Sequence, residues 1–308
     1  MKILMALGGN ALLQRHQPLE CDLQAQNVAY AAKILHTITK HHQLSLCHGN
    51  GPQVGLLSLI SHAYTKVTPY PLDVLVAETQ GMIGYMLQQA LLNEGVEKAI
   101  TMITQVRVGA DDPAFRTPTK PIGPVYDKET AFNLAKEKGW EVAVDGEYYR
   151  RVIASPKPKE IIELGAVRDL IEKGYVVIFS GGGGVPVIEN KKTRFLEGVE
   201  AVIDKDRASA LAAIELGMDF FVILTDVAAV YINWGTKDQK AIKEISPEEL
   251  KKMDFARGSM GPKADAACEF VLKTGKSAVI GELFQGEDLL NGTSGTLVTN
   301  NAEETVYY

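Results

Sequence analysis

The stretch AIELGMDFFVIL, residues 213–224, shows the pattern that decides the fold class of this chain. A helix-like segment ends at Gly217, and a continuous apolar run, Phe220–Leu224, begins shortly after it. Glycine suits the left-handed backbone conformation just past the end of a helix. An uninterrupted apolar run is typical of a strand that is buried on both faces of a parallel sheet. The stretch therefore predicts a helix that leads directly into a central strand.

The same junction recurs along the chain. Its other copies are Gly95 before Ala99–Val106, Gly174 before Tyr175–Ser180, and Gly275 before Ser277–Gly281. Buried strands that alternate with helices of about 10–20 residues indicate βαβ units. We therefore expect an α/β protein with a doubly wound, mainly parallel central sheet, whose ligands bind at the carboxyl ends of the strands.

The composition is that of a folded and acidic globular protein. Of the 308 residues, 46% are hydrophobic and 23% are charged, which excludes a disordered or fibrous chain. The formal net charge is -6 at pH 7, so no overall positive field attracts nucleic acid or anionic lipid. We expect neither a nucleic acid nor a membrane as a partner, and any anion must be bound by a local site.

The cysteines and the N-terminal residues bear on the compartment. Cys21, Cys47 and Cys268 include no C-x-x-C pair, which argues against a disulfide framework or a cysteine-rich metal site. The apolar run after Lys2 is too short for a signal peptide, and no stretch reaches the roughly 20 apolar residues that span a bilayer. A cytoplasmic protein is expected.

One segment, residues 111–158, departs from the alternation of helices and strands. Prolines gather at both of its borders, and two strand-like runs, Glu141–Val144 and Tyr148–Ile153, flank Asp145-Gly146, a dipeptide that favours a tight hairpin turn. We interpret residues 1–308 as a single domain into which residues 111–158 are inserted as a small, protruding, lid-like subdomain. Proline would stiffen its two connections. A decorated surface loop is the alternative.

Three predicted strands end in loops of small residues. These loops are Gly8-Gly9-Asn10, Gly49-Asn50-Gly51 and Gly181–Gly184. Where side chains are missing, backbone N–H groups can approach a charged ligand closely, and the N-termini of the following helices favour negative charge. Three such loops at one sheet edge predict an anion site that includes Gly181 and Gly182. Loops that only turn the chain are the alternative.

The familiar nucleotide-binding signatures are absent from the sequence. No G-x-x-x-x-G-K-[ST], H-R-D or D-F-G motif occurs, which excludes a Walker P-loop and a protein kinase. The segment Gly49–Gly55 approaches a dinucleotide fingerprint, but proline stands inside its turn, and no acidic residue is found where the next strand should end.

Three lysines stand at junctions where neighbouring residues fix the backbone. Lys120 lies within PTKP, Lys205 lies within DKD just before a predicted helix, Arg207–Leu216, and Lys263 follows Gly261-Pro262. The transition state of phosphoryl transfer spreads negative charge over equatorial oxygens, so catalysis depends mostly on fixed cations and positioning. The lysines, with Asp206 to hold them in place, therefore predict phosphoryl transfer.

Eight stretches spread over the whole chain carry a family resemblance. They are ALGGNAL (Ala6–Leu12), HGNGPQVG (His48–Gly55), PLDVLVAETQGMIGY (Pro71–Tyr85), DPAFRTPTKPIGPVY (Asp112–Tyr126), GGGGVPV (Gly181–Val187), GVEAVIDKDRASA (Gly198–Ala210), LTDVAAVYINWG (Leu224–Gly235) and GSMGPK (Gly258–Lys263). Together they resemble the carbamate kinases, a branch of the amino-acid kinases.

The resemblance implies the amino-acid-kinase fold, a doubly wound three-layer sandwich with a protruding subdomain, assembled as a homodimer. It implies the reversible reaction of ATP with carbamate to give ADP and carbamoyl phosphate. Similar enzymes that serve the breakdown of arginine, agmatine or purine-derived compounds usually run towards ATP. Mg²⁺ is expected to arrive with ATP or ADP, held largely by phosphate oxygens, because the sequence contains no dense cluster of carboxylates.

The resemblance also assigns site residues by their place in the matching stretches. The loops that hold the carbamoyl and transferred phosphoryl groups correspond to Gly8, Gly9, Asn10, Gly49, Asn50 and Gly51. The phosphate-contacting lysines correspond to Lys120, Lys205 and Lys263, and the aspartate that organises them to Asp206. The stretches that line the nucleotide pocket contain Thr225, Asp226, Tyr231, Met260, Gly261 and Lys263. No residue is assigned to a protein-bound metal.

Two alternatives stay open. Other amino-acid kinases carry a lysine two residues before the first Gly-Gly pair, where this chain has Ala6, and this favours the carbamate kinase branch. A kinase of another small carboxylate, acetylglutamate kinase-like, would need a side chain for the acceptor's second charge, commonly arginine, and no arginine lies in a glycine loop. A regulatory nucleotide-binding module without catalysis would show erosion at the lysine positions, and all three lysines are present.

The predicted chemistry requires no catalytic histidine. Carbamate is already an anionic oxygen nucleophile at neutral pH, so its attack on the γ-phosphorus needs no general base. We therefore expect His48 to be a packing or hydrogen-bonding residue at a strand end, and Cys47 to be a small hydrophobe of the core.

Overall fold

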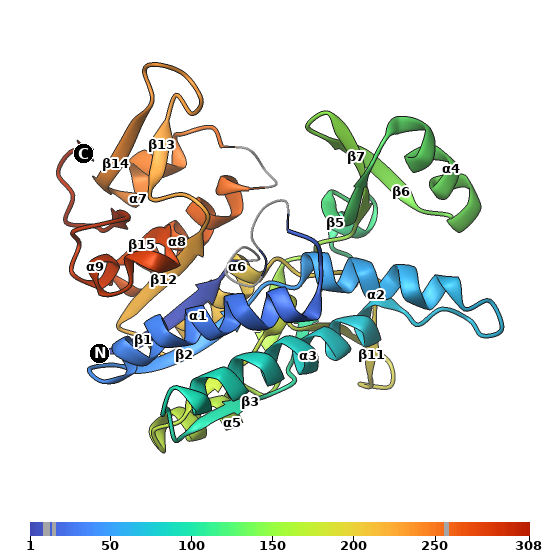
Figure 1. Cartoon of the computed structure of the whole chain (residues 1–308), viewed down its shortest axis with the longest axis horizontal. Coiled ribbons are helices and arrows are strands. Elements are labelled where there is room, and N and C mark those ends of the chain that lie inside the picture. Colours follow the sequence, from blue (N-terminus) through green and yellow to red (C-terminus); the bar gives the residue numbers. More distant parts are fainter. Residues whose placement is uncertain (9–12, 14–16, 256–258) are drawn as a thin grey trace.

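The main sheet of the protein has ten strands (Figure 1). The structure, a computed structural model, describes residues 1–8, 13, 17–255 and 259–308. Six neighbouring strands, from β15 to β3 in the order below, pair in parallel, which confirms the predicted α/β class with a mainly parallel sheet. The strand order is β13 (Val230–Ile232), β14 (Lys240–Ile245), β16 (Thr296–Val298), β15 (Ala278–Glu282), β12 (Phe220–Thr225), β1 (Lys2–Leu7), β2 (Gln43–His48), β9 (Val176–Ile178) and β3 (Ala99–Thr101), with β17 (Val306–Tyr307) paired to β14.

Helices cover both faces of this sheet, so the protein has three layers. One face carries α1 (Cys21–Thr39) and α3 (Leu72–Asn93), and the other carries α5 (Leu164–Glu172), α6 (Lys205–Glu215) and α8 (Met260–Thr274). Strand β1 shows the cause, because five of its six residues are buried and successive side chains point to opposite faces. Ile3, Met5 and Leu7 join the core beneath α1 and α3, whereas Leu4 and Ala6 join the core on the other face.

Several further helical elements in the described part of the chain are short. They are α7 (Pro247–Lys251), α9 (Glu287–Leu290) and the 3₁₀ turns Pro113–Phe115, Gly181–Gly183 and Leu283–Gln285. None of the helices in the described part of the chain combines the length and the apolar character that a bilayer span needs.

The glycine junctions predicted from the sequence are confirmed. Gly95, Gly174, Gly217 and Gly275 all have positive φ angles, between 65° and 95°, and each is followed by a strand of the main sheet. A side chain at such a position would be strained, because the left-handed conformation is unfavourable for residues with a Cβ atom.

The predicted strand Ala99–Val106 is wrong in its extent. The segment forms two strands in different sheets, β3 and β4 (Gln105–Val108), which are separated by residues 102–104. No glycine or proline marks a break in residues 99–106, but β3 pairs with β9 of the main sheet, whereas β4 pairs elsewhere. The second sheet has the order β11 (Leu196–Gly198), β10 (Val185–Glu189), β4 and β8 (Pro158–Ile161).

A separate three-stranded sheet projects beyond α2 (Gly51–Ala63) and forms a lobe with α4 (Lys128–Lys138) (Figure 1). Its strands, in spatial order, are β5 (Lys120–Tyr126), β7 (Tyr148–Ile153) and β6 (Glu141–Asp145). The hairpin predicted inside the segment is present, but Asp145 remains in strand β6 opposite Tyr148, so the turn consists of Gly146 and Glu147. The chain enters and leaves the lobe at neighbouring positions, because Lys120 in β5 pairs with Ile153 in β7.

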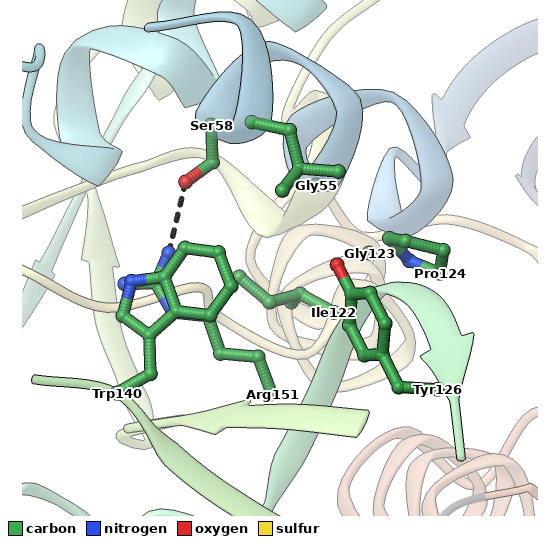
Figure 2. A pocket seen from close by; sticks show the side chains of 9 residues that line it. Gly55, Ser58, Ile122, Gly123, Pro124, Tyr126, Trp140 and Arg151 are labelled. Atoms are coloured by element: carbon green, nitrogen blue, oxygen red, sulfur yellow. Dashed lines mark hydrogen bonds between the residues drawn. The ribbon is translucent and has the colours of Figure 1, made fainter. Parts of the chain in front are cut away.

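Two glycines bring the lobe into contact with α2 (Figure 2). A Cβ atom on Gly55 of α2 would collide with the backbone of Gly123 in β5. Beside this contact, the guanidinium of Arg151 donates a hydrogen bond to Ser58 Oγ (2.8 Å) and its Cζ atom lies 4.6 Å from the centre of the Trp140 ring. The lobe therefore rests on α2, whose first residue, Gly51, is the last residue of one of the predicted anion-binding loops.

Candidate active site

The loops predicted to bind an anion follow strands β1, β2 and β9, which end at the same edge of the sheet. Leu7 at the end of β1 lies opposite His48 at the end of β2, so the first two loops start level with each other. A Cβ atom on Gly8 would lie 2.7 Å from the carbonyl oxygen of Leu224 in β12, so only glycine fits between these strands. Gly9 and Asn10 lie outside the described residues.

The second and third loops are packed into each other. A Cβ atom on Gly181 would collide with the His48 ring, and one on Gly182 would collide with the carboxamide of Asn50. The absence of side chains at Gly181 and Gly182 therefore leaves room for His48 and Asn50 at the end of β2 and in the loop after it. Gly51 differs, because a Cβ atom there meets no atom of the described residues within 4 Å. It begins α2, where the first backbone N–H groups lack carbonyl partners from a preceding turn.

The three predicted lysines come together around two aspartates. The ammonium groups of Lys205 and Lys263 contact the two oxygens of Asp206, with Lys263 Nζ 2.9 Å from Oδ2. Lys120 Nζ lies 3.0 Å from Oδ2 of Asp204. The lysines come from three separate elements, β5 of the lobe and the first turns of α6 and α8. Residues 120, 205 and 263 therefore form one cluster, as the sequence predicted.

Asp204 is a site residue to which the sequence analysis gave no role. Its Oδ1 atom accepts hydrogen bonds from the backbone N–H groups of Asp206 (3.0 Å) and Arg207 (3.2 Å), and its Oδ2 atom accepts one from Lys120 (3.0 Å). This N-cap starts α6 at Lys205, two residues before the predicted start. Aspartate directly before a helix is a recognisable signal, and it identifies the cap but not its second partner on the distant lobe.

The charges of the cluster stabilise one another. Burial opposes the ionisation of Asp206, but the positive charges of Lys205 and Lys263 outweigh it and lower the pKa of the carboxyl group. Burial likewise opposes the charge on Asp204, and Lys120 holds its pKa below the ordinary range. Both aspartates are therefore ionised at neutral pH, and three ammonium groups face two carboxylates. One net positive charge remains, as a site for an anion requires.

Burial acts to lower the pKa of both lysines that contact Asp206, but the net shifts of Lys205 and Lys263 have opposite signs. It lowers the pKa of Lys205, and the Asp206 carboxylate only partly offsets the effect. For Lys263, burial is outweighed by Asp206, and Asp204 and Asp226 add to this, so that its pKa is raised. Lys263 is thus a firmly charged group, and Lys205 is the buried cation that an incoming phosphate would most strongly stabilise.

The residues predicted to line a nucleotide pocket lie on β12, β13 and the start of α8. Thr225 ends β12, and its hydroxyl group donates to Asp226 Oδ1 (3.1 Å). Met260 and Gly261 form the first turn of α8 with Lys263. Tyr231 lies in β13, with its ring edge-on to Trp234 at a centroid distance of 5.0 Å. The influence of Asp226 on the Lys263 pKa links the end of β12 to the lysine cluster.

His48 is buried at the end of β2 and serves the structure of the loop. Its Nδ1–H group donates to the carbonyl oxygen of Gly49 (3.0 Å). Burial lowers the pKa of His48 to about 4, which makes the ring a weak base. Burial also raises the pKa of Cys47 to about 12, so its thiol stays protonated. These two residues therefore supply no proton acceptor matched to neutral pH.

The depressed pKa of His48 predicts a pH-dependent stability. Between pH 6.5 and pH 4 the unfolded chain binds a proton at this position and the folded chain does not, so the free energy of unfolding should fall as the pH falls through this window. The expected loss is about 3 kcal/mol. Urea denaturation of the wild type and of His48→Asn, which keeps a donor for Gly49, measures it. An equally steep loss in the variant would show that another group is responsible.

The site offers few carboxylate oxygens to a metal ion. No group of three or more His, Cys, Asp or Glu side chains in the described ranges is arranged to hold one. Both oxygens of Asp206 already contact ammonium groups, and those of Asp204 are engaged by Lys120 and by the α6 backbone. A divalent ion here would be held mainly by phosphate oxygens of a ligand.

Comparisons with known proteins agree along the whole chain. The sequence pattern of the Amino acid kinase family matches residues 1–282. The carbamate kinase of Haemophilus influenzae is 52% identical over 310 residues, covering 100% of both chains. The carbamate kinase of Giardia lamblia has been solved bound to citric acid (39% identity, TM-score 0.90) and bound to AMP-PNP (40% identity, TM-score 0.87). Both structures cover 97% of this chain and 98% of their own.

Proposed function

Since this chain belongs to the amino acid kinase family, we propose that it is a carbamate kinase, which transfers a phosphoryl group reversibly between ATP and carbamate. The observation that carries the proposal is the convergence of Lys120, Lys205 and Lys263 on two neighbouring aspartates. The cluster lies in reach of glycine loops at the carboxyl edge of a parallel sheet, where ligands of such sheets bind. The full-length identity to carbamate kinases supports this choice of acceptor.

The residues of this site suit phosphoryl transfer without proton transfer. In the direction of ATP synthesis, a terminal phosphate oxygen of ADP attacks the phosphorus of carbamoyl phosphate. A new P–O bond forms, the bond between phosphorus and the carbamate oxygen breaks, and carbamate leaves as an anion. The charge that develops on the phosphoryl oxygens is stabilised by the three ammonium groups and by backbone N–H groups of the loops. We propose that Asp204 and Asp206 hold these cations in place.

We propose that ATP or ADP binds as its Mg²⁺ complex on the side of β12 and α8. The residues that would line this pocket are Thr225, Asp226, Tyr231, Met260 and Gly261, with Lys263 reaching the phosphates. The AMP-PNP complex of the Giardia enzyme supports a nucleotide site in this family. Gly8, Gly49, Asn50 and Gly51 would hold the carbamoyl and phosphoryl groups, with Gly181 and Gly182 shaping the loops that do so.

The proposed reaction is tested by ATP formation from ADP and carbamoyl phosphate. A carbamate kinase makes ATP at a rate that depends on both substrates. An acetylglutamate kinase-like enzyme would instead phosphorylate its amino-acid acceptor, and a regulatory module would bind ADP without turnover. Absence of ATP formation by the folded wild-type chain would reject the proposal.

We also propose that the enzyme is cytoplasmic and works in arginine catabolism. Deletion of its gene in the host should then block ATP production from arginine.

We further propose that residues 111–158 act as a lid that brings Lys120 to the phosphoryl group. The lobe carries Lys120 at its border and touches α2 through the contact of Gly55 with Gly123 (Figure 2). Substrate-induced closure of such segments is common because it excludes water and completes the site. Limited proteolysis inside the segment should slow severalfold when ADP and carbamoyl phosphate are added. Identical cleavage rates with and without ligands would contradict the lid.

A homodimer is proposed on the basis of apolar side chains that remain exposed on two neighbouring helices. They are Leu56 and Ile60 on α2 and Val74, Tyr85 and Leu92 on α3. Exposed apolar side chains gathered on neighbouring helices often mark a contact between subunits. Sedimentation equilibrium should give twice the mass of the chain, and Ile60→Asp should shift it towards the monomer. A monomeric wild type would contradict the proposal.

A further inference from the structure

Thr79 of α3 holds the loop that follows β2. Its hydroxyl group donates to the carbonyl oxygen of Val76 (2.8 Å), so it can only accept a hydrogen bond from Asn50, and Asn50 Nδ2 supplies it (2.8 Å). Gly182 packs against the Asn50 carboxamide so closely that a Cβ atom would collide with it. Thr79 and Asn50 are both buried. The orientation of Asn50 is therefore set by α3.

The next residue of α3, Gln80, fixes Thr104, and Thr104 in turn fixes the loop that follows β9. Its side chain pairs with both backbone groups of Thr104, as Nε2 donates to the carbonyl oxygen and Oε1 accepts from the N–H group (each 3.1 Å). The hydroxyl oxygen of Thr104 in turn accepts a hydrogen bond from the N–H group of Ser180 (2.9 Å). Gln80, Thr104 and Ser180 are all buried, so these bonds do not compete with bulk water.

The backbone conformation of Ser180 indicates that contacts with the surrounding residues constrain its loop. Its φ and ψ angles are 48° and 36°, a left-handed conformation that residues other than glycine seldom adopt. Such a conformation persists only where the surroundings impose it. Ser180 leads directly into Gly181 and Gly182, which pack on His48 and Asn50. The Thr104 contact and this packing supply the constraint.

We infer that Thr79 and Gln80 are positioning residues, which fix the two loops in the geometry that phosphoryl transfer needs. Two consecutive residues of one helix thereby set the relative placement of loops 49–51 and 180–184, which come from different strands. The inference rests on the proposed function and extends it to a stretch, Pro71–Tyr85, that carries the family resemblance but has no role in the chemistry described above. Neither side chain needs to touch a substrate.

The replacement Thr79→Val tests the first half of this inference. Valine keeps the shape of threonine but leaves Asn50 Nδ2 without its buried acceptor, so kcat for ATP formation should fall on the order of 10- to 100-fold. The KM for ADP should stay within about twofold, because the proposed nucleotide residues lie on β12, β13 and α8. In an Asn50→Ala background, Thr79→Val should cost less than about twofold more, since the two residues act as one unit. Equal losses in both backgrounds would overturn the inference.

The matched control is Thr101→Val, which removes another threonine hydroxyl group bound to α3. Thr101 Oγ1 donates to the carbonyl oxygen of Gly84 (2.8 Å), which lies more than one turn beyond Thr79 on α3. Its kcat should stay within about twofold of the wild type, as expected for a hydrogen bond that is coupled to no site residue. A loss as large as that of Thr79→Val would attribute the effect to helix packing and overturn the inference.

Hydrogen exchange separates failure of the inference from failure of the proposed function. Thr79→Val should speed exchange of the amides in segment 49–54, and Gln80→Met should speed exchange in segment 180–184, at least severalfold in each case. Should Gln80→Met fail to fold, Thr104→Val removes the hydroxyl oxygen that accepts from the Ser180 N–H group and leaves both bonds between Gln80 and the Thr104 backbone in place. If the wild type makes no ATP, the proposed function fails, whereas unchanged exchange in both variants overturns the inference.

Discussion

Replacing Lys205 with methionine is expected to lower the turnover number on the order of 10²–10³-fold, about 3–4 kcal/mol of transition-state stabilisation. Methionine retains most of the aliphatic stem, so the change removes chiefly the ammonium group that contacts Asp206. Burial already lowers the pKa of this lysine, and a phosphoryl group carrying growing negative charge would stabilise its charged form. The charge is therefore most useful when the transition state is present.

Initial rates of ATP formation from ADP and carbamoyl phosphate measure the effect. Lys273→Met is the matched control, because Lys273 lies on α8, is exposed and forms a surface ion pair with Glu269 one turn away. Its turnover should stay within about twofold of the wild type, as is usual for a surface ion pair. A Lys205→Met enzyme within threefold of the wild type would remove Lys205 from the proposed mechanism.

Replacing Asp206 with asparagine is expected to have the largest effect on stability. The carboxylate is buried and contacts two ammonium groups, so the neutral side chain leaves both cations without their main counter-charge. Loss of one partner of a buried ionic cluster typically costs about 3–5 kcal/mol of unfolding free energy. Urea denaturation at pH 7 measures the loss. The Lys263 pKa, which Asp206 raises, should fall in the same variant.

Asp265→Asn provides the control for this experiment. Asp265 lies on α8 near Lys263, but its side chain is exposed. Its carboxylate makes only a long contact, of 3.8 Å, with the guanidinium of Arg207. Its replacement should change the free energy of unfolding by less than about 0.5 kcal/mol. If Asp206→Asn is as mild as this control, the two ammonium groups do not depend on the Asp206 charge, and its assignment as the organising residue is wrong.

Local signals in the sequence were sufficient to place most of the parallel strands of the main sheet. Gly217 and Gly275 have the left-handed conformation that their position after a helix predicts, and β1 coincides with its apolar run. The break at residues 102–104 was not visible, because no glycine or proline marks it and the sequence does not reveal which partner each half will pair with. That choice depends on Gln80, β8 and β10, which lie far from Thr104 in the sequence.

The site was predictable where fixed backbone and charge coincide. Lys120, Lys205 and Lys263 could be selected because proline, glycine or aspartate stands beside each of them. The network of Thr79, Gln80 and Thr104 was missed, because its members are ordinary polar residues whose importance comes from burial and from contacts between distant segments. The spacing of Val76, Ile83 and Leu87 puts positions 79 and 80 on the buried face of the helix, but it does not indicate which groups their polar atoms bond to.

The pairing of Lys120 with Ile153 gives the lobe a modular character. The N–H group of Thr119 donates to the carbonyl oxygen of Ile153 (3.2 Å), so the incoming and outgoing strands are neighbours where they meet the body of the protein. A two-residue turn is enough to join such antiparallel ends. Excising the lobe, or grafting one from a relative, would therefore leave the threading of the remaining chain intact. The lobe can therefore vary in sequence and length with little effect on the topology of the main sheet.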